Sequence, residues 1–502
     1  MDSKNTSGSK LKVVNIGQRT EANKVEGLSF EKDHRIALYV RLADELKTQI
    51  LQGTFKAGQK LPSFRALASA KNVSINTVQE AYRFLEDNNW IVVRSQSGAY
   101  VEKKLPEVKY SDELSNSVVR RNISSTGQAS ILTYREDLIP LGAAIPDESF
   151  FPCQKLAHGM ANLLRKKPKL IGNYNFAPGS LELRQQIARR VIAWGATVDP
   201  RRVTITNGAV EGLLLCLRVV TKPGDLVAIE SPGFYGFFQL IESLGLRALH
   251  IENDPGKGFN VESFERHAAE KKIAAVMLST TVSNPTGSTM SLERKRELVK
   301  VATRYQIPVI EDATFADLNF KGDRQAAQGF DTHGLVMLCA SLTKTAAPGV
   351  RIGWVDGGRF SEQICFLKRV SSIGQSELME LALAEYLSNG GMDSHLRRIR
   401  KAMQGRVYSV AETVGKTFPP GTRFSLPSGG FLLWVELPEG IDGIELQEKA
   451  ATLGIGVAPG ALFSLDGRYR NYIRLNCAIA NQSRATEGLL RLSALINSMM
   501  DI

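Results

Sequence analysis

The sequence predicts a two-part protein: a small N-terminal α+β domain with a helix-turn-helix and a β wing, then a large α/β domain with a smaller C-terminal lobe. Three observations support this fold class. The chain has 502 residues, more than a single domain of about 100–200 residues. Two short capped helix patterns and two short β runs fall within the first hundred or so residues. From about Asp137 onward, strand-like and helical runs alternate.

Composition and charge indicate a globular protein with a basic N-terminal segment. The chain is 43% hydrophobic and 23% charged, which is typical of globular proteins. Residues 1–104 hold 17 Lys and Arg against 11 Asp and Glu, which is half of the net charge of +12. A basic N-terminal segment favours a nucleic-acid partner, although charge alone is equally consistent with a role in solubility.

Other sequence features argue against a membrane-spanning, a secreted or a metal-binding protein. No run of 18 apolar residues is present, so the sequence predicts no membrane span, and the first 20 residues lack the apolar core of a signal peptide. The five cysteines are scattered and odd in number, and none of the six histidines lies in a metal-spacing cluster. We therefore expect no metal site and a reducing cytoplasmic location.

The N-terminal domain is predicted over residues 35–104, after a flexible tail at 1–34. Apolar residues recur at helical spacing from Leu38 to Ile50, and Gly53 ends the run. Ser63 can cap a short helix that continues through Lys71.

The second helix of the pair follows a break at Asn72. Ser74 can cap it, and its predicted apolar face comprises Val78, Ala81, Tyr82 and Leu85. The brief runs IVVR and AYVE, separated by SQSG, predict a small hairpin or wing.

The large domain is predicted over residues 137–502, after an interdomain linker at 105–136 that is rich in Ser and Asn. Alternation of strands and helices indicates a largely parallel sheet. The segment from about 415 to 502 is more alternating in character and predicts the smaller lobe. The strand candidates of the sheet include 202–206, 226–230, 274–279, 309–312 and 336–341.

The segment 35–104 resembles the winged-helix domain of the GntR family of bacterial regulators. The matching elements are Leu61-Pro62-Ser63-Phe64-Arg65 with Leu67-Ala68, Val73-Ser74-Ile75-Asn76-Thr77-Val78 with Ala81-Tyr82 and Leu85, and Ser97-Gly98-Ala99-Tyr100-Val101. The resemblance implies binding to double-stranded promoter DNA. It assigns the DNA contacts to Arg65 on the first helix, to Ser74, Asn76, Thr77 and Gln79 on the recognition helix, and to Arg94 and Ser97 at the wing.

The recognition helix departs from the family pattern. Ile75 stands where these proteins usually carry arginine, and Gln79 stands where some carry another. We therefore expect fewer phosphate contacts and a shallower dependence of DNA binding on salt. Asn76 and Gln79 can pair with adenine through two hydrogen bonds. Taken singly, each of these residues could instead be part of a solvated helix face.

The large domain resembles the fold-type-I aminotransferases, which bind pyridoxal 5′-phosphate (PLP). Ser341-Leu342-Thr343-Lys344 followed by Pro348-Gly349-Val350-Arg351 matches the family's lysine segment. Asp312 lies 28 residues beyond Asn284, and Lys344 lies 32 beyond Asp312. Each motif alone is weak, because NPTG is often a turn and a lone Lys is usually solvated. Their shared order carries the resemblance.

The resemblance implies a role for each matching residue. Lys344 would form the Schiff base (aldimine), and Asp312 would keep the pyridine nitrogen protonated. Arg474 would bind the α-carboxylate of an amino acid. Asn284 would bond the 3-oxygen of the cofactor ring, and Phe234 would stack on the ring. The phosphate would be bound by Arg351, Ser341, Gly208, Ala209 and Val210. Tyr174 would reach the phosphate of a neighbouring subunit.

One departure affects the chemistry. Phe315 stands where the family usually has a tyrosine that donates to the 3-oxygen. Without this donor the aldimine pKa should rise, because a hydrogen bond to the charged form favours that form. We expect the protein to stay yellow through neutral pH, and a titration that shows an unprotonated imine at pH 7 would contradict this.

The two halves together resemble the MocR subfamily of GntR regulators. The resemblance implies a homodimer in the bacterial cytoplasm, associated with the nucleoid when bound to DNA, that senses a small amine, an amino-acid effector or PLP at Lys344. Two alternatives stay open. One is a catalytically active aminotransferase that acts on an amino acid, possibly through half-transamination only. The other is a regulator whose large domain is only a cofactor-free scaffold.

Overall fold

The computed structural model describes residues 37–88, 90–94, 97–101, 135, 137–321, 323–464, 466–479 and 481–500. They belong to two compact units, one within Met1–Arg121 and the other within Asn122–Ile502. The predicted tail at 1–34 and, apart from Arg135, the predicted linker at 105–136 lie outside the described residues. Among the described residues, no helix is long and apolar enough to cross a membrane.

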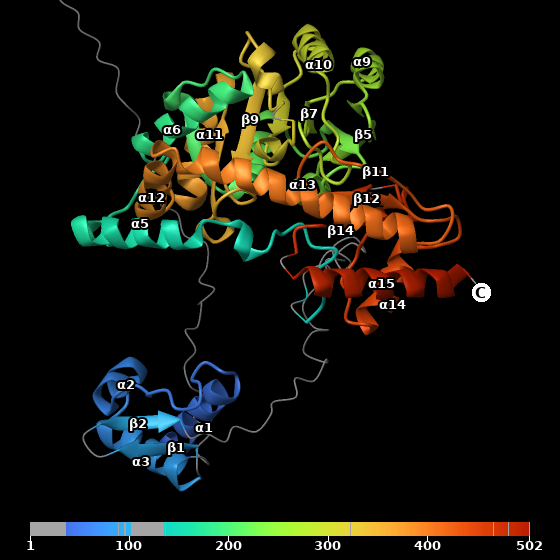
Figure 1. Cartoon of the computed structure of the whole chain (residues 1–502). Coiled ribbons are helices and arrows are strands. Elements are labelled where there is room, and N and C mark those ends of the chain that lie inside the picture. The colour runs from blue at the N-terminus through green and yellow to red at the C-terminus, as the bar shows by residue number, and fades with distance from the viewer. Residues whose placement is uncertain are drawn as a thin grey trace, which may run out of the picture. The chain divides into compact units, whose positions relative to one another are not determined.

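The N-terminal unit is a winged helix. Its elements are α1 (Leu38–Leu51), α2 (Phe64–Lys71), α3 (Ile75–Asp87), β1 (Ile91–Arg94) and β2 (Gly98–Val101), and the two strands pair antiparallel (Figure 1). Both predicted caps are confirmed. The Oγ of Ser63 accepts from the backbone N–H of Ala66 at 3.3 Å, and that of Ser74 accepts from the N–H of Thr77 at 3.0 Å.

The predicted apolar face of α3 is the centre of this unit's core. Val78, Ala81, Tyr82 and Leu85 are each no more than 1% exposed. The Tyr82 hydroxyl donates to the Pro62 carbonyl at 2.8 Å, so its polar end is satisfied inside the fold. Residues of α1, α2 and the wing complete the cluster.

The large unit contains an eight-stranded sheet in the order β3-β10-β9-β8-β7-β4-β5-β6. The five central strands from β9 to β5 are mutually parallel, which confirms the predicted character of the sheet. β10 is antiparallel to both neighbours. Its connection to β9, residues 342–351, is too short for a parallel crossover, which accounts for the direction of that pair. The bounds are β3 Val203–Asn207, β4 Leu226–Ser231, β5 Arg247–Asp254, β6 Gly258–Phe259, β7 Ala275–Leu278, β8 Val309–Asp312, β9 Val336–Ser341 and β10 Ile352–Asp356.

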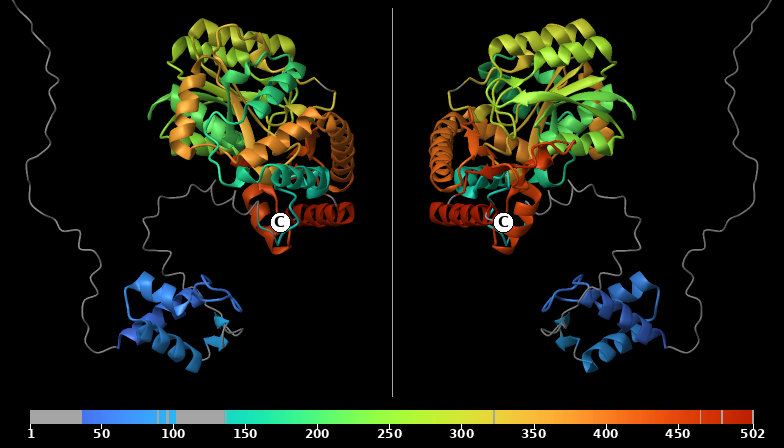
Figure 2. Two further views of the ribbon diagram at one scale, coloured as in Figure 1. Left: turned by 90° about the vertical axis from the view of Figure 1, so that its left-hand side faces the viewer. Right: turned by 90° about the vertical axis from the view of Figure 1, so that its right-hand side faces the viewer.

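Helices cover both faces of this sheet (Figures 1 and 2). Alternate residues of β9 show the two faces: Met337 and Cys339 pack in one core, Leu338 and Ala340 in the other. The first core contains α7 (Gly208–Val220), α8 (Tyr235–Ser243) and α11 (Ser361–Ser372). The opposite face is covered by α5 (Cys153–Lys166), α6 (Leu181–Val191) and α12 (Glu377–Ser388) at one end, and by α9 (Val261–Glu270) and α10 (Leu292–Tyr305) at the other.

The smaller lobe is built on an antiparallel sheet in the order β11-β12-β14-β13. Its elements are β11 (Arg423–Ser425), β12 (Leu432–Glu436), α14 (Gly443–Thr452), β13 (Ala458–Pro459), β14 (Tyr472–Asn476) and α15 (Gln482–Met500). Its core extends beyond the predicted range of 415–502. Ile139 and Leu141 pack into it, and so do Val407 and Val410 of the long helix α13 (Gly391–Thr417). The first half of α13 packs in the core of the large sheet that contains Leu338 and Ala340.

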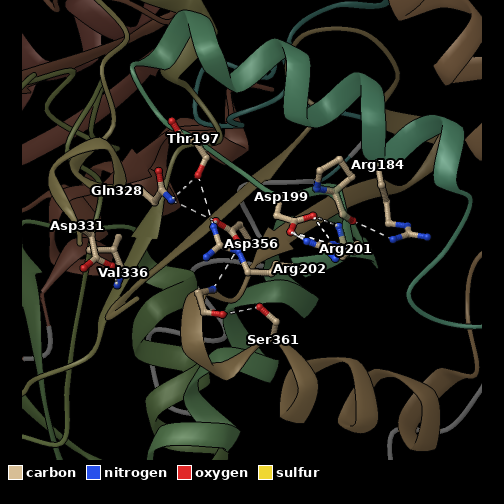
Figure 3. Close-up of polar contacts among 12 residues, drawn as sticks. Arg184, Thr197, Asp199, Arg201, Arg202, Gln328, Asp331, Val336, Asp356 and Ser361 are labelled. Atoms are coloured by element: carbon tan, nitrogen blue, oxygen red, sulfur yellow. Dashed lines mark hydrogen bonds and ion pairs between the residues drawn. The ribbon is translucent and has the colours of Figure 1, made fainter. Parts of the chain in front are cut away.

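A polar cluster joins the start of β3 to the end of β10 (Figure 3). The Asp356 carboxylate is fully buried, with Arg202 Nε at 3.4 Å and Gln328 Nε2, a donor, at 3.3 Å. Burial is the main cause that raises the Asp356 pKa to about 6. In the same cluster, hydrogen bonds from Arg201 lower the pKa of the more exposed Asp199 to about 2.

Asp356→Asn is expected to stabilise the protein increasingly as pH rises from 4 to 7. The folded carboxyl has a pKa above its unfolded value, so its stabilising effect is present at low pH and is lost as pH rises through about 6. A shift of about two pKa units corresponds to about 3 kcal/mol at most. The measurement is the melting temperature of the variant minus that of the wild type across this range.

Asp199→Asn is the matched control. Its pKa is lowered, so its own pH dependence lies below pH 4 and its melting difference should be flat between pH 5 and 7. A difference for Asp356→Asn that does not change with pH would contradict the assignment.

Candidate functional site

A cavity of about 140 Å³ opens at the edge of the large sheet where the parallel strands end. In open α/β sheets, ligands bind at this edge. Lys344 follows β9, Asp312 is the last residue of β8, Asn284 follows β7 and α7 begins directly after β3. The cavity is lined by Ala144, Ala209, Val210, Leu213, Phe234, Ser279, Asn284, Asp312, Thr314, Phe315, Ser341, Thr343, Lys344 and Arg351.

The side-chain amine of Lys344 has a lowered pKa. Its Nζ donates to the Ala144 carbonyl at 2.6 Å. Burial, followed by the positive charges of Arg474 and Arg351, lowers its pKa to about 8, while Asp312 opposes the shift. A larger fraction of this amine is therefore neutral near pH 7 than for an exposed lysine, and a neutral amine is a nucleophile.

Asp312 is the carboxylate of the cavity. It accepts from the backbone N–H of Thr314 at 2.9 Å, and burial raises its pKa. Hydrogen bonds from the Thr314 side chain and backbone N–H oppose this rise, and Thr314 also lines the cavity. Phe315 packs against Phe431 with ring centroids 5.5 Å apart and offers no hydroxyl. The expected effect of Phe315 on the imine stays a prediction.

The N-terminus of α7 and Arg351 form one end of the site. Gly208 has φ +75°, and a Cβ there would lie 2.6 Å from Arg351 Nη2. Arg351 Nη2 donates to the Asn207 carbonyl at 3.4 Å. Free N–H groups at a helix start and a guanidinium make a site suited to a phosphate. Ser341 Oγ lies nearby in the cavity, 2.7 Å from the hydroxyl of Thr343.

Arg474 of β14 lies fully buried beside Asn284. Its Nη1 donates to Asn284 Oδ1 at 2.9 Å and its Nη2 to the Gly142 carbonyl at 2.6 Å. The guanidinium lies 4.8 Å from the ring centroid of Phe463. The structure thus brings together two predicted site residues that lie 190 positions apart in the chain.

Glu230 is a buried group that the sequence prediction missed. Its carboxylate accepts from Asn253 Nδ2 at 2.8 Å, Ser283 Oγ at 3.1 Å and the Ser279 N–H at 3.2 Å. Burial raises its pKa to about 8. It therefore supports the loop that carries Asn284. A single acidic residue in the apolar run 226–231 was the available signal.

Tyr174 is one of three predicted cofactor or substrate residues that do not line the cavity, and the other two, Gly208 and Arg474, lie beside lining residues. The Tyr174 side chain is 76% exposed, and its ring centroid lies 5.9 Å from that of Phe176. It does not line the cavity of its own chain. Any role of Tyr174 in a cofactor site therefore requires a second chain.

The predicted DNA contacts lie on the N-terminal unit. Asn76 and Gln79 are exposed near the start of α3, and Arg65 is exposed on α2. The hydroxyls of Ser74 and Thr77 lie 2.8 Å apart and are engaged in the helix cap.

The two predicted wing residues contact one aromatic ring. The Arg94 guanidinium lies 4.9 Å from the centroid of the Tyr100 ring, and Ser97 Oγ lies 2.7 Å from the Tyr100 hydroxyl. These contacts orient both side chains at the tip of the hairpin.

Comparison with known families matches both halves. Residues 38–101 match the gntR family of bacterial regulatory proteins, and residues 136–492 match the aminotransferase class I and II family. The HTH-type transcriptional regulator YdcR of Escherichia coli is 34% identical over 92% of this chain and 99% of its own length. The HTH-type transcriptional regulator NorG of Staphylococcus aureus is 25% identical over 86% of this chain and 98% of its own.

Solved structures agree for the large unit. A multiple substrate aminotransferase from Thermococcus profundus superposes with a TM-score of 0.70 at 26% identity, over 75% of this chain and 96% of its own. A kynurenine aminotransferase from Pyrococcus horikoshii, solved with PMP, gives a TM-score of 0.70 at 26% identity, over 78% and 97%.

These aminotransferases depend on PLP, and the residues of the cavity suit that cofactor. PLP needs an amine, an acid for its ring nitrogen and an anion site. Lys344 and Asp312 meet the first two needs, and the glycine beside Arg351 leaves space at the helix start for the third. The chain therefore belongs to the GntR-type regulators of MocR-like architecture, in which a winged helix is joined to a PLP-dependent aminotransferase class I and II domain.

Proposed function

We propose that this DNA-binding regulator senses an amino compound, or PLP itself, through Lys344. The observation that carries the proposal is the Lys344 amine, with its pKa lowered to about 8, in a cavity that also contains Asp312. When bound, PLP supplies a carbonyl carbon at which amines can exchange. Arg474 would select an effector with a carboxylate, because a guanidinium binds that group through two hydrogen bonds.

The other residues of the cavity would orient the ligand. Asn284 already accepts from Arg474 through Oδ1, which leaves its Nδ2 to donate into the cavity. Phe234 offers a ring face. The groups for the phosphate are Gly208, Ala209, Val210, Ser341 and Arg351.

On the DNA side, we propose that Asn76 and Gln79 contact base edges, while Arg65, Arg94 and Ser97 contact the backbone. Ser74 and Thr77 would contribute mainly by fixing the start of the recognition helix, since their hydroxyls are occupied there. Residues 75–79 at the start of this helix contain no Lys or Arg, which implies a shallower dependence of affinity on salt. Binding to chromosomal DNA would place the regulator in the bacterial cytoplasm.

We further propose a homodimer in which Tyr174 reaches the phosphate site of the partner. Large apolar side chains that remain exposed on the large unit support this. Tyr174 and Phe176 are 76% and 58% exposed, and Phe366 and Val370 of α11 are 63% and 62% exposed. Hydrogen bonds from Ala177 N–H to the Ile373 carbonyl (2.9 Å) and from Arg369 Nη2 to the Ala177 carbonyl (3.1 Å) connect the two segments.

Gly353→Ala is expected to weaken PLP binding about fivefold or more. A Cβ at this position of β10 would lie 2.4 Å from the Gly208 carbonyl carbon and 2.7 Å from the Ala209 nitrogen. These are backbone atoms, so the proposed phosphate site itself must move, at a cost of about 1–3 kcal/mol. The measurement is the dissociation constant of PLP from fluorescence titration of the apoprotein.

Gly405→Ala is the control, because a Cβ there meets nothing within 4 Å. It should bind PLP like the wild type. Wild-type affinity in Gly353→Ala would mean that the helix start is not the phosphate site.

The alternative function is an active aminotransferase. Lys344, Asp312 and Arg474 would suffice for the first half of transamination. The test is to incubate the PLP-loaded chain with amino acid and keto acid pairs and count turnovers. A regulator should stop after about one equivalent of product, whereas repeated turnover that exceeds the protein concentration would favour the enzyme.

A further inference from the structure

We propose that Ile75 reads the 5-methyl group of a thymine in the major groove, so that an apolar contact supplies part of the sequence specificity. The inference rests on the proposed DNA-binding function. Ile75 is the first residue of α3, directly after the Ser74 cap, and its side chain is 45% exposed. In a helix-turn-helix, the N-terminal residues of the second helix contact base edges.

Ile75 is not a part of the core of its unit. It continues the apolar stripe of α3 in sequence, but Val78 and Tyr82 on that stripe are 0% and 1% exposed. The first turn of α3 therefore extends beyond the core and exposes the aliphatic side chain of Ile75 to solvent. Because Ile75 is β-branched, few rotamers are open to it, and little side-chain entropy is lost on contact with DNA.

Two of the polar side chains at this turn are already engaged within the helix. Ser74 Oγ accepts from the Thr77 N–H at 3.0 Å and lies 2.8 Å from the Thr77 hydroxyl. Residues 75–79 contain no Lys or Arg. The exposed groups that remain are the amides of Asn76 and Gln79 and the branched side chain of Ile75.

The major groove offers one apolar group, the thymine methyl. An isoleucine has no donor or acceptor, so this methyl is the only base-edge group that it can recognise. The two amides suit adenine. We therefore expect a half-site in which a thymine lies next to an adenine. Loss of one buried methyl corresponds to about a three- to five-fold change in affinity.

The experiment uses the full chain loaded with PLP. Duplexes bound by the wild type are recovered from a randomised pool, and each thymine of the recovered site is replaced singly by deoxyuridine, which removes only the methyl. One such replacement in a half-site should weaken the wild type about three- to five-fold and leave Ile75→Ser unchanged. Ile75→Val should keep part of the effect.

Leu38→Ala is the matched control. Leu38 is also the first residue of its helix and is 44% exposed, but it lies on α1. This variant should respond to deoxyuridine like the wild type, and equal melting temperatures would establish that the variants are folded.

Two results would overturn the inference and leave DNA binding intact: equal deoxyuridine effects in the wild type and Ile75→Ser, or no effect at any thymine. A wild type that recovers no duplex would overturn the DNA-binding function, and this inference with it.

Discussion

Lys344→Ala is expected to abolish covalent attachment of PLP to the chain. In the wild type, borohydride reduction should fix the cofactor on the peptide that contains Lys344, because that amine is the nucleophile of the cavity. The variant should give no modified peptide at this position and should lose its yellow colour on gel filtration. Peptide mass spectrometry after reduction is the measurement.

The pH dependence of the same reaction tests the environment of Lys344. Burial and two arginines lower its pKa to about 8, and only the neutral amine attacks. The rate of attachment in the wild type should therefore rise with pH and level off above about pH 8. Lys401→Ala, at an exposed position of α13, should leave rate and colour unchanged. Modification at a different lysine would contradict the assignment.

Arg474→Met is expected to remove the response to amines that carry a carboxylate while sparing covalent attachment of PLP. Methionine fills much of the buried volume but provides no donors. Loss of a buried, charge-assisted carboxylate contact corresponds to about thirty-fold or more in affinity. The measurement compares spectral titrations of the PLP-loaded chain with an amino acid and with the related amine that lacks its carboxylate.

A second readout separates this role from a structural one. Arg474 lowers the pKa of Lys344, so Arg474→Met should move the pH profile of attachment to higher pH. The same variant should be less stable, because Asn284 Oδ1 and the Gly142 carbonyl each lose a donor. Arg423→Met, on an exposed strand of the same lobe, should change neither property. An equal loss of response to both amines would contradict the carboxylate role.

Local patterns predicted most of the fold. Ser63 and Ser74 cap their helices as their residue types indicate, since an N-cap depends on a few neighbouring residues. The strand from Val336 to Ser341 is confirmed because a short apolar run is itself the signal. The antiparallel direction of β10 was not predicted, since strand direction depends on the length of the connection.

The parts of the site that could not be predicted from the sequence are those that depend on tertiary packing. The carbonyls of Gly142 and Ala144, which accept from Arg474 and Lys344, leave no trace in the sequence because every residue has a carbonyl. The inclusion of Ile139 in the smaller lobe is likewise a long-range packing event. By contrast, the order of Asn284, Asp312 and Lys344 predicted residues that line one cavity.

We expect occupancy of the cavity at Lys344 to change the affinity of the chain for DNA. The direct measurement is the dissociation constant for the duplex upstream of the chain's own gene. It is taken for apoprotein, for PLP-loaded protein and for PLP-loaded protein with each common amino acid or simple amine. In the wild type, the dissociation constant of at least one of these states should differ about fivefold or more from the others, and this difference should disappear in Lys344→Ala. The same affinity in every state, or an equal change in Lys344→Ala, would contradict it.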